Sequence, residues 1–268
     1  MKNNTFHLKG YSLPLTLQGK SSLVEPPPWH YGGKVLQITF KTDVDLVKQL
    51  LPPPFELGSD PGLAFVWFVD LISVSDSNLS MTFINPERTQ YKECLIGLHC
   101  KLKGSQGYFI PHIWVDNDFT LMRGIIQGFP KKLGRIYMTR LNEIIPKLGG
   151  IKSGAKITGI CESHGDRLIT GTIKLNRLAT EEDIPKIKFF LMRHFPSIEN
   201  PNEPSIHEIS ESITQNIEFG EIWKGKADLI FGKSNLDEII GFEPKEILSG
   251  FYFSLGFTIS GGRVLYRY

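Results

Sequence analysis

Two adjacent lysines, Lys131 and Lys132, stand in the segment QGFPKKLG, residues 127–134, behind an aromatic residue and a proline and between two glycines. Most lysine pairs of this kind lie on solvated surface turns. Here the apolar residues on both sides of the pair favour removal of at least one amine from water. Because neighbouring side chains of an extended backbone point to opposite faces, one lysine can enter an interior while the other stays nearby.

The chemistry of a buried lysine differs from that of an exposed one. A lysine with the ordinary pKa of about 10.4 is almost wholly protonated at neutral pH and cannot attack a carbonyl group. Burial and a nearby cation both disfavour the charged form and lower this pKa. The neutral amine can then condense with a ketone to give an iminium ion, which accepts an electron pair when a neighbouring C–C bond breaks.

The rest of the sequence contains few competing motifs. The glycines of ISGGRVL do not form a dinucleotide-binding fingerprint, and no phosphate-binding loop or serine-hydrolase elbow occurs. The histidines lack metal-ligand spacing, with only His99 and His112 in a common neighbourhood, so no metal site is expected. Cys94, Cys100 and Cys161 show no CxxC spacing, which indicates three thiols in a reducing compartment.

The composition is that of a folded protein without a nucleic-acid or membrane partner. Of the 268 residues, 41% are hydrophobic and 22% charged, which argues against disorder. The net charge of +2 gives no global field for nucleic acid or an anionic membrane. No apolar run reaches signal-peptide or membrane-span length, so we expect a cytoplasmic protein.

The elements around the lysine pair are mostly strands. Alternating residues in 34–41 predict a strand, and 42–51 predict a short helix that Thr42 or Asp43 caps and Pro52 ends. Residues 63–118 predict three or more antiparallel strands. Residues 116–128 predict a short helix that ends at the glycine before the lysine pair.

Further strands follow the lysine pair. They are expected within residues 134–144, 153–165, 167–178 and 185–198, as a long strand pair in 213–232, and as a last amphipathic strand near the C-terminus. Short strands at nearly regular spacing with few helices indicate one closed or nearly closed antiparallel barrel or sandwich. The prolines of SLVEPPPWH indicate that residues 1–30 form an extended arm over the surface, an element that often covers a neighbouring subunit.

The sequence resembles the acetoacetate decarboxylase family over most of its length. The resemblance lies in FPKKLG, the most specific element, and in FKTDVDLVKQLLPPPFEL, the Y-x-E of QYKECLIG, YFIPHIWVDND and FSLGFTISGG. It implies a mainly β (α+β) fold: a single-domain antiparallel β-barrel of acetoacetate decarboxylase type with a few short helices, spanning residues 1–268. It also implies a homo-oligomer.

The resemblance assigns roles to three residues. Lys131 matches the lysine that forms the Schiff base, and Lys132 the neighbour that lowers its pKa, a means of activation known for acetoacetate decarboxylase itself. Glu93 matches a glutamate that positions the substrate or protonates its carbon. The alternative for Glu93 is an ordinary strand carboxylate paired with Lys92 or Lys101.

Other positions resemble a divergent branch that includes pyruvate aldolase-dehydratases. Gly33 stands where the decarboxylases have an arginine, and Val66 where they have a second glutamate. Gln127 could orient a substrate hydroxyl and Tyr252 could transfer a proton, unless they only pack in the core. Arg123 could hold a substrate carboxylate with its planar fork, unless it is an exposed helix residue.

Three functions follow from these features. The first is a decarboxylase that converts a small β-keto acid to a ketone and CO2 through an iminium ion on Lys131, without metal or organic cofactor. The second is a pyruvate-dependent aldolase-dehydratase that uses the same lysine. The third is a non-catalytic β-barrel that binds an apolar ligand. The sequence leaves open which keto acid binds.

Overall fold

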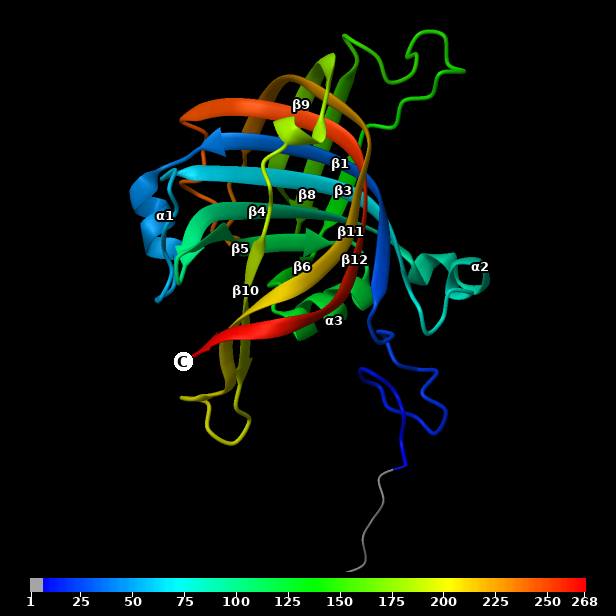
Figure 1. Ribbon diagram of the computed structural model, residues 1–268, viewed down its shortest axis with the longest axis vertical. Coiled ribbons are helices and arrows are strands. Elements are labelled where there is room, and N and C mark those ends of the chain that lie inside the picture. Colours follow the sequence, from blue (N-terminus) through cyan, green and yellow to red (C-terminus); the bar gives the residue numbers. More distant parts are fainter. Residues whose placement is uncertain (1–6) are drawn as a thin grey trace, which may run out of the picture.

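The computed structural model describes residues 7–268 and consists mainly of strands (Figure 1). The helices are α1 (Val44–Leu50), α2 (Met81–Ile84) and α3 (Asp118–Gln127). The strands are β1 (Trp29–Lys41), β2 (Glu56–Leu57), β3 (Leu63–Ser75), β4 (Gln90–Leu102), β5 (Ser105–Val115), β6 (Lys131–Leu133), β7 (Arg135–Met138), β8 (Lys156–Ser163), β9 (Asp166–Ala179), β10 (Phe189–Pro196), β11 (Pro204–Phe231) and β12 (Glu246–Arg267). The predicted mainly β fold is confirmed.

Seven of the strands form a closed ring. Their order is β10-β5-β4-β3-β1-β12-β11, and β10 closes it because it pairs with β5 on one side and with β11 on the other. The C-terminal half of β11 leaves the ring and continues the sheet through β9, β8 and β7. Nearly all neighbouring strands are antiparallel; β10 and β6 each pair with β5 in parallel.

The long strand β11 corrects one prediction. Residues 213–232 were expected to form two strands, but β11 runs without a break over 28 residues. Four register shifts along its pairing with β12, and a positive φ of 51° at Asn216, bend the strand. Bulges of this kind increase local bending and twist, so one strand can serve both the ring and the sheet beyond it.

The two faces of the ring strands carry separate apolar clusters because side chains alternate along each strand. The inner cluster includes Val35, Val69, Tyr91, Leu95, Phe251 and Phe253. The outer cluster includes Leu36, Phe68, Cys94, Ile96, Trp114 and Tyr252, together with Ile157 of β8 and Ile173 of β9. Trp67 of β3 and Phe189 of β10 identify the inner side, because their rings meet at 5.6 Å although β4 and β5 separate the two strands.

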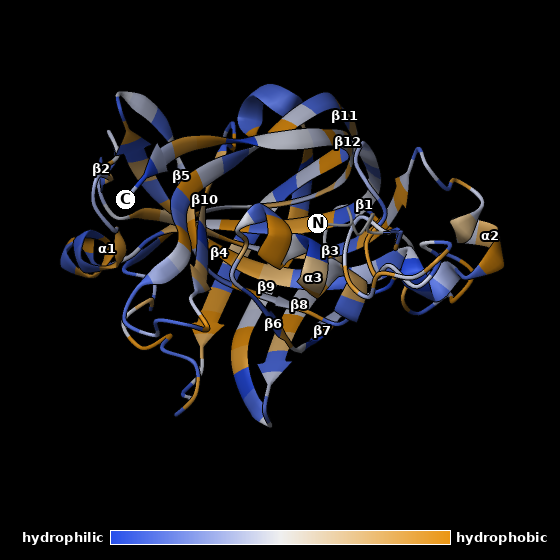
Figure 2. Cartoon of the chain, turned by 90° about the horizontal axis from the view of Figure 1, so that it is seen from below, coloured by the Kyte–Doolittle hydropathy of each residue, from blue (hydrophilic) through white to orange (hydrophobic). Residues whose placement is uncertain are grey.

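Helix α3 lies across the interior of the ring, near the centre of the view in Figure 2. On one side Arg123 Nη1 donates a hydrogen bond to Ser73 Oγ of β3 (2.7 Å). On the other, Arg193 Nε of β10 donates to the carbonyl oxygen of Ile126 (2.9 Å). The helix ends as predicted: Gly128 has φ of 104°, a left-handed conformation that glycine adopts without the strain of a side chain.

The N-terminal arm folds against its own chain. Val24 is buried in the inner cluster, and Arg88 Nη2 donates to the carbonyl oxygens of Ser22 (2.7 Å) and Leu23 (3.0 Å). The predicted boundary at residue 30 shifts slightly because β1 begins at Trp29. Residues 1–6 of the predicted arm lie outside the described residues. Within residues 7–268, none of the helices has the length and apolar character needed to cross a membrane.

Candidate active site

Strand β6 holds the lysine pair. It pairs with β5 in parallel, with Lys131 beside Ile113 and Lys132 beside Trp114. Ile113 belongs to the inner cluster and Trp114 to the outer one. The two adjacent lysines therefore point to opposite faces of the ring, as the alternation of an extended backbone requires.

The amine of Lys131 lies inside the ring with two hydrogen-bond partners. Its Nζ donates to Glu93 Oε2 of β4 (3.0 Å) and to Thr120 Oγ1 of α3 (2.8 Å). Only 6% of the Lys131 side chain and 11% of the Glu93 side chain are exposed. The lysine stem packs against Gly124, where any Cβ would collide with it. The predicted pair of Lys131 and Glu93 thus meets in one buried site.

Burial is the main cause of a lowered pKa at Lys131, because the charged amine loses its hydration. The carboxylate of Glu93 opposes this shift, and the guanidinium of Arg123 adds to it. The balance holds the pKa of Lys131 below its ordinary value. A larger fraction of neutral amine is therefore available for attack on a carbonyl group.

Two tyrosines extend the site. The Tyr91 ring centroid lies 5.4 Å from Lys131 Nζ, and burial raises the pKa of its hydroxyl well above the ordinary value. Thr120 lies near the Tyr91 hydroxyl, and Ser73 lies near that of Tyr31. Burial also raises the pKa of Tyr31, so both phenols stay protonated and can donate hydrogen bonds at neutral pH.

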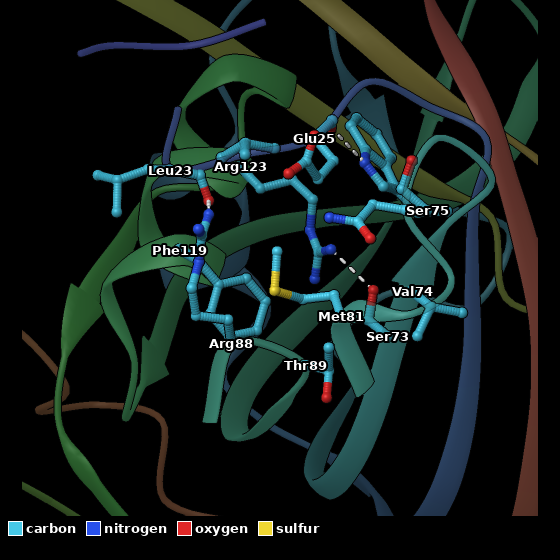
Figure 3. Close-up of a pocket in the computed structure, with 13 residues that line it drawn as sticks. Leu23, Glu25, Ser73, Val74, Ser75, Met81, Arg88, Thr89, Phe119 and Arg123 are labelled. Carbon is cyan, nitrogen blue, oxygen red and sulfur yellow. Dashed lines mark hydrogen bonds between the residues drawn. The ribbon is translucent and has the colours of Figure 1, made fainter. Parts of the chain in front are cut away.

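Arg123 is buried beside the lysine, and part of its guanidinium is free to donate further hydrogen bonds. The residue is 4% exposed, and its guanidinium carbon lies 4.9 Å from the ring centroid of Tyr31 and 5.6 Å from that of Tyr91. Nη1 binds Ser73, but the buried Nη2 has no hydrogen-bond partner in residues 7–268. A cavity of about 30 Å³ adjoins the arginine (Figure 3). The alternative of an exposed helix arginine is thereby excluded.

Lys132 lies on the face of the ring opposite to Lys131. Its Nζ donates to Asp237 Oδ1 (2.6 Å) on the outer face, where Trp114 Nε1 donates to the same oxygen (3.2 Å). The side chain is 41% exposed. Burial and the charge of Arg123 lower the pKa of Lys131, while Lys132 is paired with Asp237; an effect of Lys132 on this pKa stays a prediction.

Tyr252 faces away from the amine, and Gln127 forms its hydrogen bonds with α3 and β11. The Gln127 side chain accepts a hydrogen bond from Ser212 Oγ (3.0 Å) and donates to the carbonyl oxygen of Arg123 (3.4 Å), one helical turn beyond Arg123. Tyr252 belongs to the outer cluster, and burial raises the pKa of its hydroxyl. Because Tyr252 faces away from the ring interior, it cannot transfer a proton at Lys131.

The two departures from the decarboxylase pattern have structural causes. Gly33 leaves no room for a side chain, because a Cβ would meet the Asp70 carbonyl oxygen of β3. Val66 packs in the outer cluster and faces away from the amine. Tyr31 and Ser73, opposite each other in β1 and β3, occupy the inner face near Arg123 instead. The sequence analysis missed both residues.

A signal for two further missed residues was present in the sequence. In Tyr91-Lys92-Glu93, the residues at i and i+2 of a strand share one face, so a site that contains Glu93 also contains Tyr91. Thr120 lies one helical turn before Gly124, on the side of α3 that carries Arg123. Among residues 7–268, no group of three or more His, Cys, Asp or Glu side chains is placed to hold a metal ion.

A buried lysine with a lowered pKa therefore lies beside a carboxylate and an arginine inside the ring of strands. The family model described as acetoacetate decarboxylase matches residues 12–268, and the chain belongs to this family. A relative named acetoacetate decarboxylase, from Clostridium botulinum, is 23% identical over 89% of this chain and 88% of its own length.

Two enzymes of known structure are more similar to this chain in sequence than that relative. The enduracididine biosynthesis enzyme MppR complexed with pyruvate is 32% identical, with a TM-score of 0.87 over 97% of this chain and 99% of its own. The same enzyme has also been solved with the condensation product of pyruvate and imidazole 4-carboxaldehyde. An acetoacetate decarboxylase-like enzyme from Sphingomonas wittichii is 28% identical, with a TM-score of 0.90 over 97% of this chain and all of its own.

Proposed function

We propose that this protein is a Schiff-base lysine enzyme that activates a small 2-keto acid, such as pyruvate, for carbon–carbon bond formation with an aldehyde. The observation that carries the proposal is the buried Lys131 amine, 3.0 Å from Glu93 and beside an arginine whose Nη2 has no hydrogen-bond partner among residues 7–268. The amine adds to the ketone carbonyl and water leaves, so that an iminium ion forms.

Glu93 supplies the proton transfers of the following steps. Its Oε2 lies within hydrogen-bond distance of the nitrogen that becomes the iminium. From this position the carboxylate can take a proton from the carbon next to the iminium and give an enamine. Thr120 holds the nitrogen from the other side at 2.8 Å and so fixes the direction of the lysine.

Arg123 favours a reaction in which the carboxylate remains. A guanidinium binds a carboxylate with two parallel hydrogen bonds, and the free Nη2 offers such a donor. Decarboxylation turns the carboxylate into neutral CO2, so the ion pair weakens in the transition state and the barrier rises. Bond formation at the enamine carbon keeps the ion pair throughout.

The second candidate is decarboxylation of a small β-keto acid. It is supported by the relatives named acetoacetate decarboxylase, which are 21–24% identical over most of the chain. The same iminium ion would accept the electron pair of the broken C–C bond. The structure at 32% identity that binds pyruvate favours the first candidate over this one.

Reductive trapping tests the proposal. The protein is incubated separately with pyruvate and acetoacetate, borohydride is added, and intact mass and the modified peptide are measured together with CO2 release. We expect a pyruvate adduct on Lys131 without CO2. CO2 from acetoacetate would establish the second candidate. An absence of adduct from both keto acids would contradict Schiff-base chemistry and leave a ligand-binding barrel.

A further inference from the structure

A second cavity opens beyond Arg123 along the same helix. It has a volume of about 170 Å³ and lies between the C-terminal end of α3, the arm, and strands β10, β11 and β12. Its polar lining consists of Gln127, Arg193, Ser210, Glu211, Ser212 and Arg263. Liquid water occupies about 30 Å³ per molecule, so the space suits a small metabolite. Sequence analysis did not identify this cavity.

The cavity lies about one helical turn from Arg123 of the lysine site. Gln127, in its lining, follows Arg123 by one turn of α3 and precedes Lys131 by four residues. Trp29 lines both this cavity and the smaller one beside Arg123, whose guanidinium carbon is 5.6 Å from the Trp29 ring centroid. A molecule in the larger cavity would therefore lie next to a keto acid held by Arg123.

Positive charge exceeds negative charge around this cavity. Arg193 and Arg267 pair with Glu208, while Arg263 and Lys188 pair with Glu211. The lining itself contains two arginines, Arg193 and Arg263, and one carboxylate, Glu211. The pKa of Glu211 is lowered by hydrogen bonds from Lys188 and Arg263, although burial acts in the opposite direction.

The arginines of the lining keep unused donors. Arg263 donates through Nε to Glu211, and its two terminal amino groups make no hydrogen bond within residues 7–268. Arg193 uses Nε and Nη1, for Ile126 and Glu208, and keeps Nη2. Arginine forks bind carboxylate and phosphate groups with two parallel hydrogen bonds. The hydroxyls of Ser210 and Ser212 add short polar groups to the same wall.

We infer that this cavity binds the second reactant, an aldehyde that carries a carboxylate or phosphate group recognised by Arg263 and Arg193. This inference rests on the proposed function, because the enamine at Lys131 must have a carbonyl partner. The anionic group lies against the arginines, and the aldehyde end points along α3 toward Arg123 and Lys131.

The bond-forming step balances without any further reactant. The enamine carbon donates its electron pair to the aldehyde carbon, and the new C–C bond forms while the aldehyde π pair moves to oxygen. That oxygen takes the proton which Glu93 removed earlier, and Lys131 returns to the iminium form. Addition of water then releases the free lysine and a hydroxy-keto acid.

Two matched aldehyde pairs test the inference: succinic semialdehyde with butanal, and glyceraldehyde 3-phosphate with glyceraldehyde. The variant is Arg263→Gln, and its control is Arg267→Gln, which removes the same charge from the same strand outside the cavity lining. Both side chains are mostly exposed, so the fold should persist, and thermal unfolding verifies this.

We expect Arg263→Gln to raise the KM of the preferred anionic aldehyde by about tenfold or more, because a charged hydrogen bond is lost. The KM of its neutral partner and of pyruvate should stay within about twofold, and Arg267→Gln should change none of them. Whichever of succinic semialdehyde and glyceraldehyde 3-phosphate has the lower KM shows whether the cavity prefers a carboxylate or a phosphate group. Equal use of neutral and anionic aldehydes, or equal effects of both variants, would overturn the inference.

A separate measurement keeps this inference distinct from the proposed function. Pyruvate trapping on Lys131 is measured first in the unmodified protein, because its failure concerns the lysine site alone. Calorimetric titration with succinate and with inorganic phosphate then reports on the cavity without turnover. Binding that weakens in Arg263→Gln but not in Arg267→Gln supports the anion site. Trapping of pyruvate without condensation of any of the four aldehydes contradicts it.

Discussion

The two faces of β6 carry the same side chain in opposite surroundings. On the inner face, Lys131 is 6% exposed, and its amine contacts Glu93 and Thr120. On the outer face, Lys132 is 41% exposed and forms an ion pair with Asp237. The comparison shows that burial inside the ring is the main cause of the lowered pKa of Lys131. The cation that does act on Lys131 comes from Arg123 on another element.

The largest expected effect comes from exchanging the two lysines separately for an apolar residue of similar length. Lys131→Met removes the nucleophile, so we expect a loss of at least about 10⁴-fold in kcat/KM and no borohydride adduct. Lys132→Met should retain the adduct on Lys131 and lose less than about tenfold in activity. Kinetics and peptide mapping measure both effects. Similar losses in the two variants would contradict the division between the faces.

A second prediction concerns Gly124, which leaves space for the lysine stem. Gly124→Ala places a Cβ against the Lys131 side chain and displaces the amine from Glu93. Since a displacement of about 1 Å can cost about 10²-fold in rate, we expect kcat to fall by that order. Alanine also favours helix over glycine, so the melting temperature should change little.

The matched control for this helix variant is Gly32→Ala in β1. A Cβ at Gly32 meets no atom within 4 Å, so activity should be unchanged. The rate of trapping with pyruvate and borohydride is measured for both variants. A slower rate in Gly124→Ala alone would show that the loss of activity arises at the Lys131 amine. Normal trapping in Gly124→Ala would show that the lysine stem does not depend on this space.

A third prediction uses the charge of Arg123. Arg123→Gln removes the cation that lowers the pKa of Lys131, so this pKa rises. Because the neutral amine is the reactive form, the acidic limb of the kcat/KM profile should move to higher pH. Loss of the carboxylate partner should also raise the KM of the keto acid by about tenfold to 100-fold.

Arg140→Gln is the control for this charge change. Arg140 pairs with Asp70, and 77% of its side chain is exposed, so its removal should leave the acidic limb in place. The pH dependence of kcat/KM, measured for both variants at constant ionic strength, separates a local effect from a change in overall charge. A shift of the limb to lower pH in Arg123→Gln would contradict the assigned sign.

The sequence predicted those parts of the fold and site that depend on local chemistry. Helix α1 begins after Asp43, whose carboxylate accepts hydrogen bonds from the backbone amides of Asp45 and Leu46. Helix α3 ends at Gly128 for a similarly local reason. Lys131 and Glu93, which meet in the structure, could be proposed together because the motifs that contain them are short and continuous in the sequence.

Features that depend on pairing between distant strands were harder to predict from the sequence. The face to which Tyr252 points depends on the register of β12 against β1, and a shift of one residue would reverse it. Ser73 and Tyr31 become neighbours only through the pairing of β1 with β3. The ion pair of Lys132 was not predicted, because its partner, Asp237, comes from the segment between β11 and β12.

The smallest expected effect on catalysis comes from the outer face. Asp237 is 2% exposed and accepts hydrogen bonds from Lys132 and Trp114. Asp237→Asn keeps the shape but removes the negative charge, so we expect the free energy of unfolding to fall by about 1–3 kcal/mol. Activity should fall by less than about tenfold, because the inner contacts of Lys131 remain. Denaturant unfolding and the pH profile of kcat/KM measure the two effects.

A double variant tests how the ion pair of Lys132 and Asp237 contributes to stability. If Asp237 acts only by neutralising its lysine, adding Lys132→Met to Asp237→Asn should recover part of the lost stability, because no unpaired cation remains. The acidic limb of the pH profile should stay in place in both variants. If the acidic limb moves as far as in Arg123→Gln, the charge on the outer face affects the pKa of Lys131 across β6. The two faces would then not be electrostatically independent.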